Sequence, residues 1–326
     1  MKVLVTGGTG FIGSRLVERL VQQGHQVRLV AKDRWNTVFL ESLNVELVLG
    51  DLNDGMNVDE IVGDSERVYH LAGMVRARSN RDYYDGNYLA TKNFIKACAR
   101  SSKNLRRFVY VSSLAAAGPS RNGKPLTEDA PCRPVSHYGR SKMLAEKEVL
   151  RYRDKFPVTI VRPSAVYGPR DREMLQYILL VKRHLQPLIG FRTKWLNLIH
   201  VDDLVNGLLL AGEHPKAEDE TFFLGSETPY STAEIGNTVA AILNLKLIPI
   251  HIPHFVVFAV GAVGEGVARL TGKQIFFNIQ KVKESVQPGW ICSVQKAKSR
   301  LGFSQRVSFL EGMRRTYRWY EENGWV

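Results

Sequence analysis

Three polar side chains in the middle of the sequence, Ser113, Tyr138 and Lys142, have types and spacing suited to moving a proton at a carbonyl or hydroxyl group. Tyrosine has an ordinary pKa of about 10, and a nearby cation lowers that pKa because it stabilises the phenolate. Lys142 stands four residues after Tyr138, on one face of a predicted helix. Ser113 follows the apolar run Phe108–Val111, where its hydroxyl can hold the oxygen whose proton Tyr138 exchanges. The tyrosine–lysine spacing alone also fits an ordinary exposed helix face.

A glycine-rich turn near the start of the chain predicts a phosphate-binding site. Residues 6–13, TGGTGFIG, follow the apolar run Val3–Val5 and precede an amphipathic stretch. Gly7 lets the chain turn off a strand, Gly10 lets the backbone approach a pyrophosphate, and Gly13 lets a helix lie close to the sheet. The helix N-terminus then points N–H groups and a positive dipole end at phosphates. An ordinary tight turn is the alternative, but a dinucleotide fits this position between strand and helix better.

The elements that position these residues alternate along the first half of the chain. Short apolar runs predict strands at Val3–Val5, Val27–Val30, Val45–Leu49, Val68–Leu71, Phe108–Val111 and Val158–Val161. Residues 87–100 and 138–152 between them have helical periodicity. Such alternation predicts βαβ units and an α/β fold with a doubly wound parallel sheet, covered by helices on both faces.

The second half of the chain predicts a smaller, mostly helical lobe. Helical patterns cover residues 171–185, 202–211, 232–243 and 308–322, and residues 196–200 resemble a strand. We expect a dinucleotide-binding domain over residues 1–168, to which residues 196–225 return, and a substrate-binding lobe over most of 169–326. This lobe would cover the carboxyl ends of the strands, where open α/β sheets bind ligands.

Composition narrows the classes of protein that the chain can belong to. It has 326 residues, 44% of them hydrophobic, which is enough for a sizeable core. The net charge of +13 is spread along the chain, and without a basic run or a DNA- or RNA-binding motif we expect no nucleic-acid partner. Three scattered cysteines predict no metal site and fit a cytoplasmic location, and the early glycine turn leaves no room for a signal peptide.

The most apolar stretch, residues 255–270, contains Glu265 and is shorter than the roughly 20 apolar residues that a membrane-spanning helix needs. No transmembrane span is therefore predicted. We expect a buried or substrate-lining helix. The alternative is an interfacial helix that makes peripheral membrane contact.

Taken together, the motifs resemble the extended short-chain dehydrogenase/reductase superfamily, or NAD-dependent epimerase/dehydratase family, over essentially the whole chain. Besides the glycine turn, the matching motifs are GDL at 50–52, HLAG at 70–73, VYVSSLAAAG at 109–118, YGRSK at 138–142, VRPSAVYGP at 161–169 and IHVDDL at 199–204. The resemblance implies a Rossmann fold and a nicotinamide dinucleotide. It also implies Ser113, Tyr138 and Lys142 as the catalytic set, with Asn87 supporting the active-site helix.

The same resemblance implies which residues contact the cofactor. Asp51 would accept a hydrogen bond from the adenine amino group, and Leu52 would pack on that ring. Lys142 would also hold the ribose next to the nicotinamide. The other residues implied at the cofactor are Gly7, Gly10, Phe11, Ile12, Gly13, Leu71, Ala72, Gly73, Tyr138, Pro163 and Val166.

The residues after the second predicted strand indicate which form of the cofactor is bound. In Rossmann enzymes an acidic residue there binds the ribose 2′-hydroxyl of NAD, and a basic residue accommodates the 2′-phosphate of NADP. Here the strand ends at Ala31, and Lys32 and Arg34 stand on either side of Asp33. We predict that NADP is favoured over NAD, with Asp33 as an NAD-binding residue in the alternative.

Two reaction classes share these motifs: nucleotide-sugar epimerases or dehydratases with retained NAD, and oxidoreductases with net hydride transfer. The sugar enzymes commonly have an asparagine after the strand that ends near Arg162, and an arginine before the IHVxDL motif. Ser164-Ala165 and the WLNL of residues 195–198 stand there instead. The chain is therefore more similar to the 3β-hydroxysteroid dehydrogenase and dihydroflavonol reductase branch. Arg192 and Lys194 remain candidates for binding a diphosphate.

That branch implies a ketone or secondary alcohol on a bulky apolar substrate, which is steroid-, flavonol- or ketoalkanoate-like, with Tyr138 as general acid/base. A non-catalytic dinucleotide-binding regulator is a further alternative, although such proteins usually lack the tyrosine or the lysine. Helices at 88–100 and 138–154 resemble those that pair in dimers of the family. We expect a homodimer whose ligand is a small-molecule substrate, and a monomer is the alternative.

Overall fold

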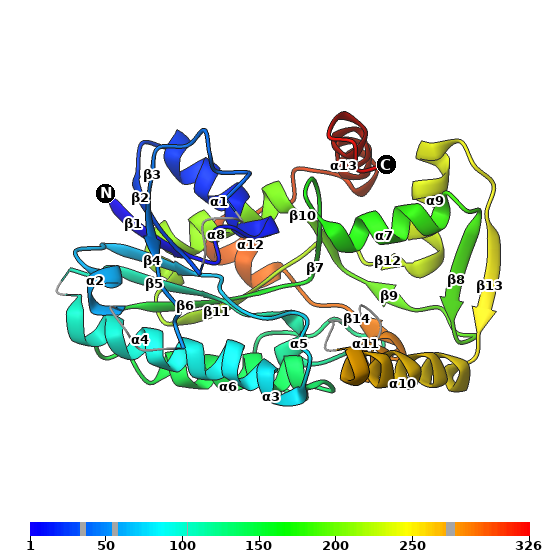
Figure 1. The fold of residues 1–326 in the computed structure, drawn as a ribbon, viewed down its shortest axis with the longest axis horizontal. Coiled ribbons are helices and arrows are strands. Elements are labelled where there is room, and N and C mark those ends of the chain that lie inside the picture. The colour runs from blue at the N-terminus through cyan, green and yellow to red at the C-terminus, as the bar shows by residue number, and fades with distance from the viewer. Residues whose placement is uncertain (33–36, 54–57, 103, 272–277) are drawn as a thin grey trace.

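The computed structural model describes residues 1–32, 37–53, 58–102, 104–271 and 278–326, and its largest element is a seven-stranded parallel sheet (Figure 1). The strand order is β11-β6-β5-β4-β1-β2-β3. All six predicted strands are present, as β1 (Lys2–Thr6), β2 (Gln26–Ala31), β3 (Val45–Leu49), β4 (Arg67–His70), β5 (Arg107–Val111) and β6 (Val158–Pro163). The order reverses between β1 and β4, and such a switch point is where α/β sheets bind ligands. The expected Rossmann-like α/β fold is confirmed.

Helices cover both faces of this sheet, because successive residues of a strand point to opposite sides. Val3 and Val5 of β1 pack in one core with helices α1 (Phe11–Gln22) and α8 (Val201–Glu213). Leu4 packs in a second core on the other face. The helices of that second core are α2 (Val58–Val62), α4 (Ala90–Ser101) and α6 (His137–Leu150).

A late segment of the chain returns to the first core. Helix α12 (Gln295–Leu301) lies beside β11 (Glu220–Leu224), the strand at one edge of the sheet. Ala297 and Leu301 of this helix, together with Val294 and Phe303, pack in the same core as β1. The residues between β11 and Val294 therefore form an excursion from the sheet half of the molecule.

The smaller lobe contains most of the other helices, namely α7 (Arg172–Val181), α9 (Thr232–Leu243), α10 (His254–Thr271), α11 (Ile279–Ser285) and α13 (Phe309–Glu322). It also contains short strands. The sequence predicted one strand at 196–200, which the structure divides into Trp195–Leu196 and Leu198–His200, and it did not predict the others. A parallel ribbon joins β8 (Leu185–Ile189) to β13 (Ile248–Ile252), and β9 (Trp195–Leu196) pairs with β12 (Tyr230–Ser231) and β14 (Gly289–Trp290). Between lobe and sheet, β7 (Ala165–Tyr167) pairs with β10 (Leu198–His200). Within the described residues, we find no helix with the length and apolarity to cross a membrane.

Candidate active site

The glycine turn after β1 has the close backbone contacts that require glycine. Gly7 has a φ of +72°, and a Cβ on it would lie 2.6 Å from the backbone nitrogen of Ala72. A Cβ on Gly13 would lie 2.2 Å from the carbonyl oxygen of Gly7. Any side chain at either position would therefore push the turn away from its neighbours, so that α1 could not approach the sheet.

The N-terminus of α1 is open to a ligand. Gly10 is the N-cap residue and supplies no side chain to the free N–H groups of the first turn. Gly10, Phe11 and Ile12 line a large cavity. An exposed helix N-terminus beside a glycine turn fits a pyrophosphate, so the residues present here fit the nicotinamide dinucleotide that the sequence predicts.

At the adenine end of the predicted cofactor site, two of the implied residues interact with each other. The Lys32 ammonium lies 2.7 Å from a carboxylate oxygen of Asp51, and this ion pair lowers the pKa of Asp51 against the opposing effect of its partial burial. Leu52 is buried in the second core. Asp33 and Arg34 lie outside the described residues.

The predicted catalytic residues come together at the carboxyl end of β5. Ser113 follows that strand and caps the short helix α5 (Leu114–Ala117), while Tyr138 and Lys142 lie one turn apart on α6. Burial raises the pKa of Tyr138, and a hydrogen bond with the Ser113 hydroxyl acts in the opposite direction. The serine and tyrosine hydroxyls thus share one site, as two groups that act on the same substrate oxygen must.

Lys142 is buried behind Tyr138. Its ammonium donates a hydrogen bond of 2.8 Å to the carbonyl oxygen of Val111 and lies 4.9 Å from the centre of the Tyr110 ring. Burial lowers the pKa of Lys142 to about 8, and the Glu146 carboxylate partly opposes this shift. The lysine is therefore still mostly protonated at neutral pH, and it loses its charge under mildly alkaline conditions.

Asn87 joins the loop after β4 to the active-site helix. It lies in a π-helical segment, η1 (Tyr84–Leu89), between α3 (Asn80–Tyr83) and α4, and π-helical turns often occur at functional sites. Its side-chain oxygen accepts a 2.7 Å hydrogen bond from the Met74 backbone, and its Nδ2 donates to the Ser141 hydroxyl at 2.9 Å. Ser141 in turn donates to the Tyr138 carbonyl at 2.7 Å. Asn87 thereby positions the peptide that carries the tyrosine.

His70 extends this chain of hydrogen bonds to β1. The Thr91 hydroxyl donates to the Asn87 carbonyl, so it must accept from Nε2 of His70, which lies 2.9 Å away. Nδ1 is then the acceptor for the Thr6 hydroxyl at 2.6 Å, and that hydroxyl accepts from the Ala72 backbone. Burial lowers the pKa of His70 to about 3. A neutral histidine in one tautomer therefore links the cofactor turn to the active-site helix.

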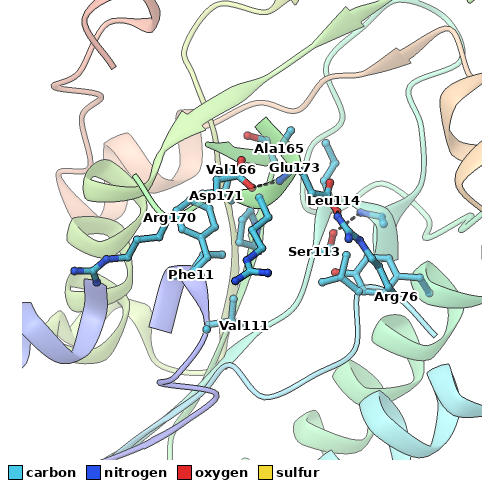
Figure 2. A pocket seen from close by; sticks show the side chains of 18 of the residues that line it. Phe11, Arg76, Val111, Ser113, Leu114, Ala165, Val166, Arg170, Asp171 and Glu173 are labelled. Atoms are coloured by element: carbon cyan, nitrogen blue, oxygen red, sulfur yellow. Dashed lines mark hydrogen bonds and ion pairs between the residues drawn. The ribbon is translucent and has the colours of Figure 1, made fainter. Parts of the chain in front are cut away.

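One cavity of about 1220 Å³ connects the glycine turn with the predicted catalytic residues Ser113 and Tyr138 (Figure 2). Of the predicted site residues, it is lined by Gly10, Phe11, Ile12, Ser113, Tyr138, Pro163 and Val166. Figure 2 shows Phe11 and Arg170 on one side of the cavity, with Ser113 and Leu114 on the other. Much of the remaining wall is apolar, and includes Val38, Val75, Leu196, Trp290 and Trp319. In the described ranges, no group of three or more His, Cys, Asp or Glu side chains is placed to hold a metal ion.

A charged cluster in the cavity wall was not predicted. One carboxylate oxygen of Glu173 accepts a hydrogen bond of 3.2 Å from Arg76. The other oxygen lies 3.6 Å from the Lys281 ammonium. Glu284, whose pKa is raised by burial, accepts a 2.6 Å hydrogen bond from Ser136. These residues come from segments far apart in the sequence and belong to no local motif, so nothing in the sequence marked them.

Comparison with known proteins agrees with this geometry. Residues 3–225 match the model of the NAD dependent epimerase/dehydratase family. A ceramide reductase of Caulobacter vibrioides is 29% identical over 99% of this chain and 96% of that protein. A 2-alkyl-3-oxoalkanoate reductase of Shewanella oneidensis is 28% identical over 95% of this chain and 84% of that protein.

Solved structures show the same fold over the full length. The UDP-glucose 4-epimerase of Thermotoga maritima, determined with UDP-glucose, has a TM-score of 0.82 at 22% identity and covers 99% of both chains. At this identity the likeness concerns the fold alone. The family match, which covers more than half of the chain, identifies it as a member of the NAD dependent epimerase/dehydratase family, and thus as an NAD(P)-dependent enzyme of the extended short-chain dehydrogenase/reductase type.

Proposed function

We propose that the protein transfers a hydride between nicotinamide and a ketone or secondary alcohol on a bulky apolar substrate. The bound nicotinamide supplies or accepts the hydride. Ser113 holds the substrate oxygen by a hydrogen bond, and Tyr138 gives that oxygen its proton in reduction or removes it in oxidation. Lys142 supplies positive charge one helical turn from the phenol, and Asn87 keeps the Tyr138 peptide in place.

The lining of the cavity is the observation that carries this proposal. Arg192 and Lys194, the two candidates for a sugar diphosphate, are both absent from it. The Lys194 ammonium instead donates to the Ser285 carbonyl at 2.7 Å, and Arg192 is exposed on the surface. Four cations line the cavity. Arg76 and Lys281 share the Glu173 carboxylate, and Arg170 pairs with Glu18. Arg172 lies over the ring of Trp325, 5.5 Å from its centre. A largely apolar wall whose cations mostly have carboxylate partners suits a carbon skeleton better than a diphosphate.

The names of two relatives support the same class of substrate. They are reductases of a ceramide and of a 2-alkyl-3-oxoalkanoate. A carbonyl on a largely hydrocarbon skeleton is consistent with both names. In such a substrate the carbonyl would lie at Ser113 and Tyr138, and the hydrocarbon remainder would lie along the cavity wall.

For the cofactor we propose a preference for NADP. In the described part of the chain β2 ends at Ala31, and no carboxylate stands at that position. Lys32 is two-thirds exposed and pairs with Asp51, and such exposed pairs contribute only about 0–1 kcal/mol. The lysine can therefore turn to a 2′-phosphate at little cost. We expect Lys32→Ala to weaken NADPH binding about tenfold and to leave NADH unchanged. Tighter binding of NAD than of NADP by the unaltered protein would contradict the preference.

The reaction class is tested with substrates of both kinds. We expect NADPH to be consumed with apolar ketones, and we expect those ketones, together with NADP, to raise the melting temperature. Stabilisation by UDP- or dTDP-sugars, with no turnover of any ketone, would instead favour the alternative of a nucleotide-sugar epimerase with retained NAD. If the protein binds the dinucleotide but neither ketones nor nucleotide sugars are turned over or raise its melting temperature, the alternative of a non-catalytic dinucleotide-binding regulator would be favoured.

We also propose a homodimer formed through α4 and α6. Leu89, the last residue of η1 and the N-cap of α4, is 40% exposed, so its side chain is available to such an interface. Analytical ultracentrifugation of the protein and of Leu89→Glu tests this. A dimer that becomes a monomer in the variant supports the interface, and an unaltered monomer refutes it.

A further inference from the structure

We propose that the far end of the small lobe is a docking surface for an anionic lipid bilayer. This surface, called here the lobe tip, consists of the outer face of α10 and the adjoining β8–β13 ribbon. Its main side chains are Phe191, Ile248, Ile250, Phe255, Phe258 and Val263. Phe191 and Phe255 are each about three-quarters exposed, at 75% and 74%. Single exposed apolar residues are common on proteins, but a contiguous group marks a site of interaction.

The two faces of α10 differ, and in the part of the chain that the structure describes its outer side is left exposed. The inner face packs on α11, where Val257 is buried and a Cβ on Gly261 would lie 2.5 Å from Val282. The outer face carries Phe255, Phe258 and Val263 at helical spacing and leaves all three exposed. A helix on the surface of a soluble protein normally presents polar side chains to water. The outer face of α10 presents apolar side chains instead.

A second segment brings apolar surface to the same place. Gly190, at the end of β8, lies against the side chain of His254, because a Cβ on the glycine would lie 2.6 Å from its Nε2. The ring of the next residue, Phe191, stacks on His251 at 5.6 Å. Figure 1 shows β13 running into α10 at the end of the molecule opposite β1. Phe191 and Phe255, which are far apart in sequence, thus lie at one corner.

The charge around the lobe tip identifies an anionic bilayer as the occupant. Residues 182–194 and 244–271, which include the whole of α10, contain six Lys and Arg and one acidic residue, Glu265. Of these cations Lys182, Arg183, Arg192 and Lys246 are exposed, at the two ends of the ribbon. Aromatic and aliphatic side chains flanked by basic ones bind the interface of membranes that contain acidic lipids. A second copy of the chain would instead place these cations against each other, with Glu265 as the one acidic residue of these segments to pair with them.

The lobe tip also lies close to the cavity. Helix α11, on which α10 packs, contributes Lys281, Glu284 and Ser285 to the cavity wall. One helix therefore separates the proposed bilayer contact from the substrate site. The proposed docking surface does not depend on the proposed function. If both hold, an apolar substrate could reach the cavity from the membrane.

Vesicle binding tests the proposal without any substrate. The full-length protein is sedimented with vesicles of phosphatidylcholine alone and with vesicles that also contain phosphatidylglycerol. We expect binding to the anionic vesicles, and at least a tenfold loss of that binding in the double variant Phe191→Asp, Phe255→Asp. Arg192→Glu should weaken binding to the anionic vesicles in the same direction. The matched controls are Leu310→Asp on α13 and Arg121→Glu, which are exposed elsewhere and should bind as the unaltered protein does.

Two results would overturn the proposal. One is a failure of the unaltered protein to bind anionic vesicles. The other is a change of oligomeric state in the Phe191→Asp, Phe255→Asp variant, which would show that the lobe tip is covered by a second copy. Turnover of a short water-soluble ketone should be equal in the double variant and the unaltered protein, which separates loss of docking from loss of the proposed activity.

Discussion

In the sheet half of the molecule, β4, β5 and β6 are buried along their whole length, whereas four of the five residues of β13 in the lobe are exposed. Parallel strands covered by helices on both faces are mostly apolar. A two-stranded ribbon is marginal by itself and leaves apolar side chains uncovered. The sheet half therefore fixes the positions of the glycine turn and the candidate catalytic residues, while the lobe leaves apolar side chains exposed.

The largest effect is expected at Tyr138, where the sheet half meets the cavity. Removal of the phenol oxygen leaves the framework intact and takes away the proton donor, so we expect Tyr138→Phe to lower kcat by about a thousandfold without changing cofactor binding. Steady-state rates and fluorescence titration of the dinucleotide check both parts. Tyr83→Phe, which alters another tyrosine of the cavity wall, should keep most of the activity. Unchanged turnover in Tyr138→Phe would show that the assigned chemistry is wrong.

The next largest effect is expected at a close backbone contact in the sheet half, at Gly13. Gly13→Ala places a Cβ 2.2 Å from the Gly7 carbonyl, and relief of that clash must move α1 or the turn. We expect a loss of about 1–3 kcal/mol in the free energy of unfolding and weaker dinucleotide binding. Urea unfolding and cofactor titration measure the two quantities. A variant with the stability and affinity of the unaltered protein would show that the close approach of α1 is not required.

Acid should weaken the sheet half through its buried histidines. Burial lowers the pKa of His70 to about 3 and that of His200 to about 4, from an ordinary value of 6.5. Below pH 6.5 the unfolded chain binds protons that the folded protein does not, so stability falls by up to about 1.4 kcal/mol per pH unit for each histidine. Asp171, whose pKa is raised to about 6, binds a proton in the folded state and offsets part of this loss.

Between pH 7 and pH 5 we therefore expect a net loss of about 2 kcal/mol, measured by urea unfolding at both values. His70→Gln is less stable at neutral pH because it breaks the chain of hydrogen bonds. Its stability should nevertheless depend less steeply on pH, since one of the titrating groups is gone. Equal slopes for the variant and the unaltered protein would contradict the assignment of His70 as a buried neutral histidine.

The smallest change in stability is expected in the small lobe. Gly266 lies in the interior of α10, and a Cβ there would meet nothing described within 4 Å. Gly266→Ala should therefore stabilise the protein by about 0.5–1 kcal/mol, because alanine loses less backbone freedom in a helix. Gly261→Ala, five residues earlier and against Val282, is the matched control and should destabilise it. If thermal unfolding showed equal effects at both positions, the two faces of α10 would not differ as described.

The sequence predicted the sheet half well because its strands contain short apolar runs, such as Val3–Val5, that alternate with periodic helices. The catalytic set was predictable for a similar reason: Ser113, Tyr138 and Lys142 belong to motifs whose elements are each local in sequence. Their roles rest on geometry and resemblance, and the kinetic tests above decide them.

The lobe was less predictable. β8 contains Gln186 and Pro187, and β13 contains Pro249 and His251, so neither has the uniform apolar pattern of a buried strand. Their pairing joins segments about sixty residues apart, which no local pattern records. The cluster around Glu173 was missed because its members converge only in three dimensions.

The return of α12 to the first core has a consequence for how the protein is made. Because Ala297, Leu301 and Phe303 fill part of the core beneath β1, the sheet half stays incomplete until residue 303 has left the ribosome. At about 5–20 residues per second, the first strands wait for about 15–60 s with apolar surface uncovered. Newly made chains should therefore depend on chaperones or on bound dinucleotide during that interval, and a chain that stops before α12 should aggregate instead of folding as a smaller enzyme.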